Sequence, residues 1–217
     1  MKHQIMECEE YLMEKRILCF GDSNTWGFTA VTGERHPEGV RWTSLLKEKL
    51  GCTVIEEGLN GRTSSFPDRL LPHGTGTDYI QACVASQAPL DLLIIMLGTN
   101  DMKYYVCNCA DASAKGVMMV ADLAKRILPE LPILIVSPAP IGRFRPELGP
   151  MFQINQDSIE NSWKLADRLK EQAELNGYYY MNAADYAEVS KEDAVHLDAE
   201  NHAKLAEAIA NKVREIL

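Results

Sequence analysis

The sequence has no apolar run that approaches the ~20 residues needed to cross a membrane. Its first segment, MKHQIMECEEYLMEK, carries acidic residues where a secretory signal would have an uninterrupted apolar stretch. It has no run of five basic residues, and its formal net charge is -9. Because phosphates attract basic patches, this charge predicts no nucleic-acid partner. The lack of long apolar stretches predicts no secretory signal and no membrane insertion.

Two other kinds of motif are also missing. Neither GxGxxG nor GxxxxGK[ST] occurs, so no glycine-rich loop is predicted to cradle phosphates. No second CxC or CxxC accompanies Cys107 and Cys109, so the six cysteines do not form a zinc motif of the usual spacing. Reduced thiols in a cytoplasmic protein are therefore predicted.

What the sequence does contain is a regular alternation of apolar runs and amphipathic segments. Continuous apolar runs are typical of parallel strands that are covered on both faces. The alternation predicts an α/β fold, with an open and mostly parallel sheet between helices. Residues 15–217 are predicted to be a single domain, with residues 1–14 as an N-terminal extension. The predicted strands are 16–20, 52–58, 90–97, 132–140 and 177–183; the predicted helices are 41–50, 77–86, 112–128, 155–177 and 199–217.

Small polar residues follow four of the predicted strands. The segments are GDSN at 21–24, GLNGRTS at 58–64, GTND at 98–101 and SPAP at 137–140. In open α/β sheets, the active site lies outside the carboxyl ends of the strands. Each segment alone is typical of a turn, but four at successive strand ends predict one shared crevice.

The residue types in these segments point to acyl transfer. Ser23 lies directly after the first strand, where a sharp turn would expose its hydroxyl group as a nucleophile. Gly61 lacks a Cβ, so its N–H can approach a ligand oxygen closely, and the Asn100 amide can donate to a developing oxyanion.

A serine nucleophile needs a base, and the chain has five histidines. His196 lies just before the last predicted helix, three residues after Asp193. At that spacing the carboxylate can meet Nδ1 of the imidazole, which leaves Nε2 free to face a serine. His202 falls inside the helical pattern, which indicates a structural or surface role.

Together, GDSN, GLNG, GTND and DAVH resemble the four sequence blocks of the SGNH hydrolases, also called GDSL-type esterases and lipases. The resemblance covers essentially all of residues 15–217. The contexts RILCFGDSNTWGF, VRWTSLL, VIEEGLNGRTS and LDLLIIMLGTND are most similar to the bacterial arylesterase/acyltransferase branch. This resemblance implies a flavodoxin-like three-layer α/β/α sandwich with a five-stranded parallel sheet, and no metal or organic cofactor.

The resemblance also implies a role for each site residue. Ser23 would be the nucleophile, His196 the general base and then acid, and Asp193 the carboxylate that orients it. The oxyanion hole would consist of the Ser23 N–H, the Gly61 N–H and the Asn100 side chain. The expected pocket residues are Asp22, Asn24, Trp26 and Phe28, with aromatic anchoring of the first helix as the alternative for the last two.

The sequence departs from the family motif at one position. Asn24 stands where the family name has leucine, directly after the expected nucleophile. We expect only a local effect of this asparagine on packing or on the polarity of the pocket.

The predicted function is hydrolysis of small, short-chain aryl or alkyl esters through a Ser23 acyl-enzyme, with acyl transfer to alcohols as an added outcome. Carbohydrate O-deacetylation, thioester cleavage and lysophospholipase activity use the same machinery and stay open. A metal-dependent phosphoesterase and a non-catalytic ligand-binding module are the alternatives from other classes. The expected partner is a small-molecule ester, and the resemblance is compatible with a homo-oligomer.

Overall fold

The structure is a computed structural model that describes residues 15–143 and 149–217; the predicted extension, residues 1–14, lies outside them. One parallel sheet of five strands has the order β2-β1-β3-β4-β5. This is the order of flavodoxin-like doubly wound sheets, which confirms the predicted fold class. The strands are β1 (Arg16–Gly21), β2 (Thr53–Gly58), β3 (Leu92–Met96), β4 (Ile133–Ser137) and β5 (Tyr179–Asn182).

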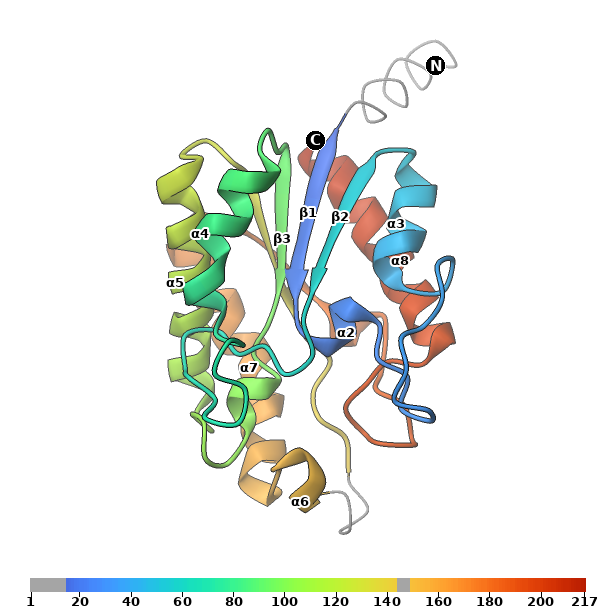
Figure 1. The fold of residues 1–217 in the computed structure, drawn as a ribbon, viewed down its shortest axis with the longest axis vertical. Coiled ribbons are helices and arrows are strands. Elements are labelled where there is room, and N and C mark those ends of the chain that lie inside the picture. Colours follow the sequence, from blue (N-terminus) through green and yellow to red (C-terminus); the bar gives the residue numbers. More distant parts are fainter. Residues whose placement is uncertain (1–14, 144–148) are drawn as a thin grey trace.

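Helices cover both faces of the sheet, which gives the three layers (Figure 1). The helices α4 (Gly76–Gln87), α5 (Ala110–Ile127) and α7 (Gln156–Leu175) lie on one face. The opposite face carries α3 (Trp42–Leu50) and α8 (Ala199–Ile216). The shorter elements are α2 (Ser23–Trp26), α6 (Gly149–Phe152) and the 3-10 turns η1 (Asn100–Met102) and η2 (Ala183–Asp185).

The central strand β1 shows how the sheet builds two separate cores. Leu18 and Phe20 pack among residues of α4, α5 and α7, whereas Ile17 and Cys19 pack among residues of α3 and α8. Successive side chains of a strand point to opposite faces, so both sets must be apolar. All four side chains are fully buried, which explains why this strand is a continuous apolar run.

The chain turns sharply at the carboxyl end of β1. The side chain of Asp22 caps α2 by accepting a hydrogen bond of 3.0 Å from the Asn24 N–H. The helix ends after one turn at Gly27, which has a left-handed φ of 90° and lets Phe28 follow at once. β1 connects to β2 on one side while β3 lies on the other, so this turn is at the switch point of the sheet.

His202 is a fully buried residue of α8, and its Nδ1 accepts a hydrogen bond of 3.3 Å from the Trp42 N–H. Its ring meets the His36 ring edge-on, with 5.2 Å between centroids. Burial, with a smaller contribution from the His36 charge, lowers the pKa of His202 to about 3. The folded protein therefore keeps this imidazole neutral.

This burial predicts a loss of stability in mild acid. As the pH falls below about 6.5, the unfolded chain protonates His202 but the folded chain does not, so the free energy of unfolding decreases. In His202→Asn, a side-chain oxygen can still accept from Trp42 without titrating. The decrease in Tm between about pH 7 and pH 5 should therefore be smaller in this variant than in the wild type. Equal decreases in two thermal unfolding series would contradict this assignment.

Candidate active site

Ser23, His196 and Asp193 form one chain of hydrogen bonds at the carboxyl edge of the sheet. Ser23 is the first residue of α2, and its Oγ lies 2.9 Å from Nε2 of His196. On the other side of the ring, Nδ1 lies 2.5 Å from Oδ2 of Asp193. All three residues are buried, so the contacts are largely shielded from water. The structure thus brings together the three residues that the sequence singled out.

The Asp193 carboxylate both shapes its loop and orients the imidazole. Its Oδ1 accepts hydrogen bonds from the backbone N–H groups of Val195, at 2.9 Å, and His196, at 3.0 Å. Burial alone would raise the pKa of Asp193, but the hydrogen bonds from the His196 ring and from the backbone outweigh it and lower that pKa. An ionised Asp193 holds the imidazole proton on Nδ1, which leaves the Nε2 lone pair facing Ser23.

Gly61 and Asn100 lie on the wall of a cavity that Ser23 and His196 also line. Gly61 has a left-handed φ of 78°, and a Cβ there would lie 2.6 Å from Cδ1 of Leu71. Nδ2 of Asn100 donates to the Arg62 carbonyl at 3.2 Å and lies 3.4 Å from Oδ2 of Asp22. These contacts hold the Asn100 amide in place at the wall of the cavity.

Asp22 is a fully buried carboxyl directly before Ser23. Burial raises its pKa to about 6, although the Asn24 N–H and the charges of His196 and Arg62 act in the opposite direction. Its two oxygens face the Asn24 N–H and the Asn100 amide. Asp22 therefore joins the end of β1 to the turn that follows β3.

The cavity at Ser23 has a volume of about 250 Å³. Phe28 forms part of its wall and packs on the His196 ring, with 4.3 Å between centroids. The other predicted pocket residues, Asp22, Asn24 and Trp26, are not among its lining residues. The Arg35 guanidinium instead lies over the Trp26 ring, with 5.5 Å between Cζ of Arg35 and the ring centroid.

Several lining residues carry no sequence motif. They come from the loop after β2, the turn after β3 and the segment around α6, and they are Leu71, Lys103, Met151, Phe152, Gln153 and Ile154. Leu71 and residues 151–153 fall in the long segments 66–78 and 141–153, and segment length is their only sequence signal. Lys103 and Ile154 have no such signal. These residues give the cavity a mixed lining of apolar and polar groups.

A buried carboxyl links the loop after β2 to the turn after β3. Asp101, next to Asn100, is fully buried and accepts hydrogen bonds from the Ser64 N–H at 2.8 Å and the Ser64 Oγ at 2.5 Å. It also accepts a hydrogen bond of 2.6 Å from Oγ of Ser113 on α5. Asp101 thereby fixes the segment that bears Gly61 relative to the one that bears Asn100.

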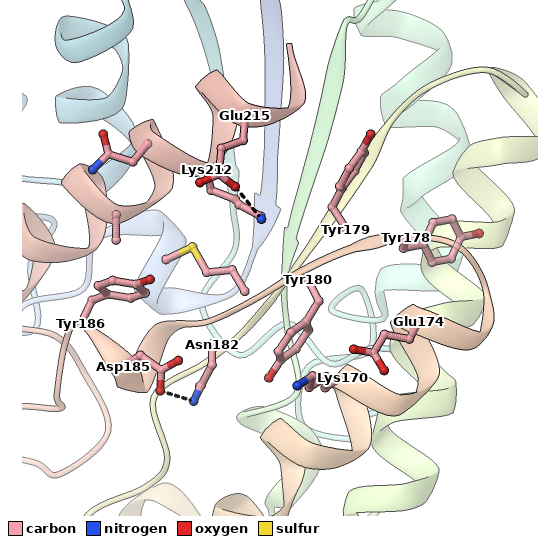
Figure 2. A pocket seen from close by; sticks show the side chains of 13 residues that line it. Lys170, Glu174, Tyr178, Tyr179, Tyr180, Asn182, Asp185, Tyr186, Lys212 and Glu215 are labelled. Atoms are coloured by element: carbon pink, nitrogen blue, oxygen red, sulfur yellow. Dashed lines mark hydrogen bonds and ion pairs between the residues drawn. The ribbon is translucent and has the colours of Figure 1, made fainter.

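A larger cavity of about 600 Å³ lies elsewhere, along the outer edge of β5 between α7 and α8 (Figure 2). Polar side chains there pair with one another, as in the contact of 2.9 Å between Asn182 and Asp185 and that of 2.8 Å between Lys212 and Glu215. Its lining contains tyrosines, lysines and acids but no serine, histidine or cysteine. The smaller cavity, in contrast, is lined by Ser23 and His196. Size alone therefore does not identify the candidate active site.

Two further observations apply to residues 15–143 and 149–217. No group of three His, Cys, Asp or Glu side chains is arranged to hold a metal ion within these ranges. None of the helices there combines the length and the apolar character that a bilayer crossing requires.

The sequence profile of the GDSL-like lipase/acylhydrolase family matches residues 19–204. Among solved structures, Est24, a carbohydrate acetylesterase from Sinorhizobium meliloti, is similar at 33% identity and a TM-score of 0.89, with 94% of this chain and 100% of that chain covered. An inhibitor-bound aryl esterase from M. smegmatis is similar at 33% identity and a TM-score of 0.88, over 94% of this chain and 100% of that one.

No match was found among curated proteins. The family profile spans most of the chain, which confirms the resemblance predicted from the four sequence blocks. The chain therefore belongs to the GDSL-like lipase/acylhydrolase family and is a carboxylic ester hydrolase.

Proposed function

We propose that the protein hydrolyses small, short-chain acyl esters with Ser23 as nucleophile, His196 as general base and acid, and Asp193 as the orienting carboxylate. The observation that carries the proposal is the chain of hydrogen bonds from Ser23 Oγ through His196 to Asp193, at the wall of a small cavity. A serine becomes nucleophilic when a base accepts its proton, and this arrangement supplies that base.

The reaction has two halves that use the same groups. His196 Nε2 accepts the Ser23 proton as Oγ attacks the ester carbonyl, and it then gives that proton to the leaving alkoxide. Water next attacks the acyl-enzyme while Nε2 accepts its proton, which passes to Ser23 Oγ as the carboxylic acid departs. During both attacks, the N–H groups of Ser23 and Gly61 and the Asn100 amide donate to the oxyanion. An alcohol that takes the place of water would give acyl transfer.

The size of the cavity limits the acyl group. A volume of about 250 Å³ is below the usual range for drug-sized ligands, and Phe28, Leu71 and Phe152 form much of its apolar wall. These residues suit a short acyl chain. The aryl esterase among the similar structures supports aryl esters as a substrate class.

A series of p-nitrophenyl esters tests this size limit. We expect kcat/KM to decrease by about tenfold or more from the butyrate to the octanoate ester, because the longer chain exceeds the space at Ser23. The measurement is the initial rate of p-nitrophenolate release, with Ser23→Ala as the blank for each ester. A flat profile through octanoate would contradict a short-chain preference.

A second candidate function is deacetylation of an acetylated carbohydrate. Polar residues of the cavity wall, among them Lys103 and Gln153, can hydrogen-bond to the hydroxyl groups of a sugar. The carbohydrate acetylesterase among the similar structures supports the same reading. Acetate release from a partly acetylated sugar, compared with p-nitrophenyl acetate, separates the two candidates.

Other sequence predictions stay predictions. They are the single domain over residues 15–217, the cytoplasmic location, the lack of a nucleic-acid partner and the compatibility with a homo-oligomer. Acyl transfer is tested by the ratio of ester to acid product when a primary alcohol is added to the hydrolysis assay.

A further inference from the structure

Asn24 is buried, and its side chain reaches from α2 to the loop that bears His196. Its Nδ2 donates to the Val195 carbonyl at 3.2 Å. Its Oδ1 accepts from the Leu197 N–H at 2.9 Å. Val195 and Leu197 are the immediate neighbours of His196 in the chain. One amide therefore holds the backbone on both sides of the imidazole.

The chemistry of these two contacts is specific to an amide. One partner is a carbonyl and the other is an N–H, so the side chain must both donate and accept. A leucine, as in the family motif, would leave both buried backbone groups without this partner, and a carboxylate could not donate to Val195. We expected Asn24 to affect only packing or the polarity of the pocket. That expectation is too narrow, because Asn24 contacts the loop that bears His196.

The backbone of Asn24 is itself held in place by hydrogen bonds. The Asn24 N–H donates to Oδ1 of Asp22 at 3.0 Å, and the Asn24 carbonyl accepts from Nε1 of Trp42 at 3.1 Å. Trp42 is buried in α3 and is not one of the residues that line the cavity. Because Ser23 and Asn24 share one helical turn, a shift of the histidine loop relative to Asn24 is also a shift relative to Ser23 Oγ.

We propose that Asn24 is a positioning residue that sets the distance between His196 Nε2 and Ser23 Oγ. The proposal rests on the proposed function, in which His196 takes the Ser23 proton. Asp193 sets the tautomer and rotation of the imidazole from within its own loop, whereas Asn24 joins that loop to the helix of the nucleophile. The two residues therefore control different parts of the geometry.

The first test is Asn24→Leu, which removes both hydrogen bonds at similar side-chain size. We expect kcat for p-nitrophenyl acetate to decrease by about 100-fold, as for a misplacement near 1 Å, while KM changes by less than about twofold. The rate of labelling by a fluorophosphonate should decrease in parallel. The low-field proton resonance of His196 Nδ1–H should remain, because Asp193 is intact.

The matched control is Val213→Ala, which makes a hole in the core at the far end of α8. It should lower the Tm by a few degrees but leave kcat near that of the wild type. A decrease in kcat that accompanies Asn24→Leu but not Val213→Ala is therefore not a consequence of lower stability.

The second test is Asn24→Asp, which regains the missing donor only when its carboxyl is protonated. Its kcat, divided by that of the wild type at the same pH, should increase several-fold from about pH 8 to pH 6. The positioning role is overturned if Asn24→Leu folds and keeps wild-type kcat. If Asn24→Leu does not fold, the role is overturned when the kcat of Asn24→Asp relative to the wild type is the same at both pH values. Wild-type activity in Ser23→Ala would instead overturn the proposed function itself.

Discussion

Ser23→Ala should lower kcat for p-nitrophenyl acetate by about 10⁴- to 10⁶-fold, the range observed when a serine triad loses its nucleophile. Without Oγ there is no atom to form the acyl-enzyme, and His196 loses the proton donor at 2.9 Å. What remains is the polar environment of the cavity, which can still assist direct attack by water to a small extent. The loss should therefore be nearly complete.

The matched control is Ser137→Ala. Ser137 is a buried serine at the carboxyl end of β4, so it shares the strand-end position of Ser23. Its Oγ contacts the Pro138 carbonyl at 3.4 Å and is not part of the cavity wall. Ser137→Ala should keep wild-type kcat and the fluorophosphonate label, whereas Ser23→Ala should lose both. Retained turnover in Ser23→Ala, with a folded protein, would mean that another residue attacks the ester.

Asp193→Asn should lower kcat by about 10⁴-fold with little loss of fold. The backbone N–H groups of Val195 and His196 both donate to Oδ1 of Asp193. In the variant they keep the amide oxygen at that position, so the NH₂ group must face Nδ1 of His196. The imidazole can then only accept at Nδ1, and its proton moves to Nε2. An N–H facing Ser23 cannot act as a base.

The measurement is kcat at neutral pH together with the circular dichroism spectrum and the low-field proton spectrum. The circular dichroism spectrum of Asp193→Asn should match that of the wild type, because the amide oxygen preserves the turn. The low-field resonance of Nδ1–H should vanish, since Nδ1 no longer carries a proton. If kcat stays within about tenfold of the wild type, the carboxylate does not orient the base and the assignment of Asp193 is wrong.

Much of the fold was predictable because its central strands β1, β3 and β4 are buried on both faces. The run at 92–96 is fully buried, so every residue in it must be apolar, and a continuous run is a strong local signal. The extent of the one-turn helix α2 was not predicted, because GDSN is equally typical of a turn. In the structure, the Asp22 cap, the backbone hydrogen bond from Gly27 to Ser23 and the left-handed Gly27 define it.

In the candidate site, too, some residues could be predicted from the sequence and others could not. Ser23, Gly61, Asn100 and the Asp193–His196 pair follow or precede elements that the sequence marks clearly, so their meeting could be predicted from topology. The cavity wall could not, because Leu71 and Phe152 are placed by long loops. The partners of Asn24 lie 171 and 173 residues further along the chain, and no local pattern encodes such a contact.

The buried carboxyl of Asp101 has a consequence for loop exchange between related enzymes. Ser64 and Ser113 hold it from two different elements, so the loop after β2, the turn after β3 and the start of α5 form one hydrogen-bonded unit. A transplanted loop that lacks Ser64 would remove one hydroxyl donor from this buried carboxyl. A chimaera that alters substrate range should therefore inherit Ser64, Asp101 and Ser113 from the same parent.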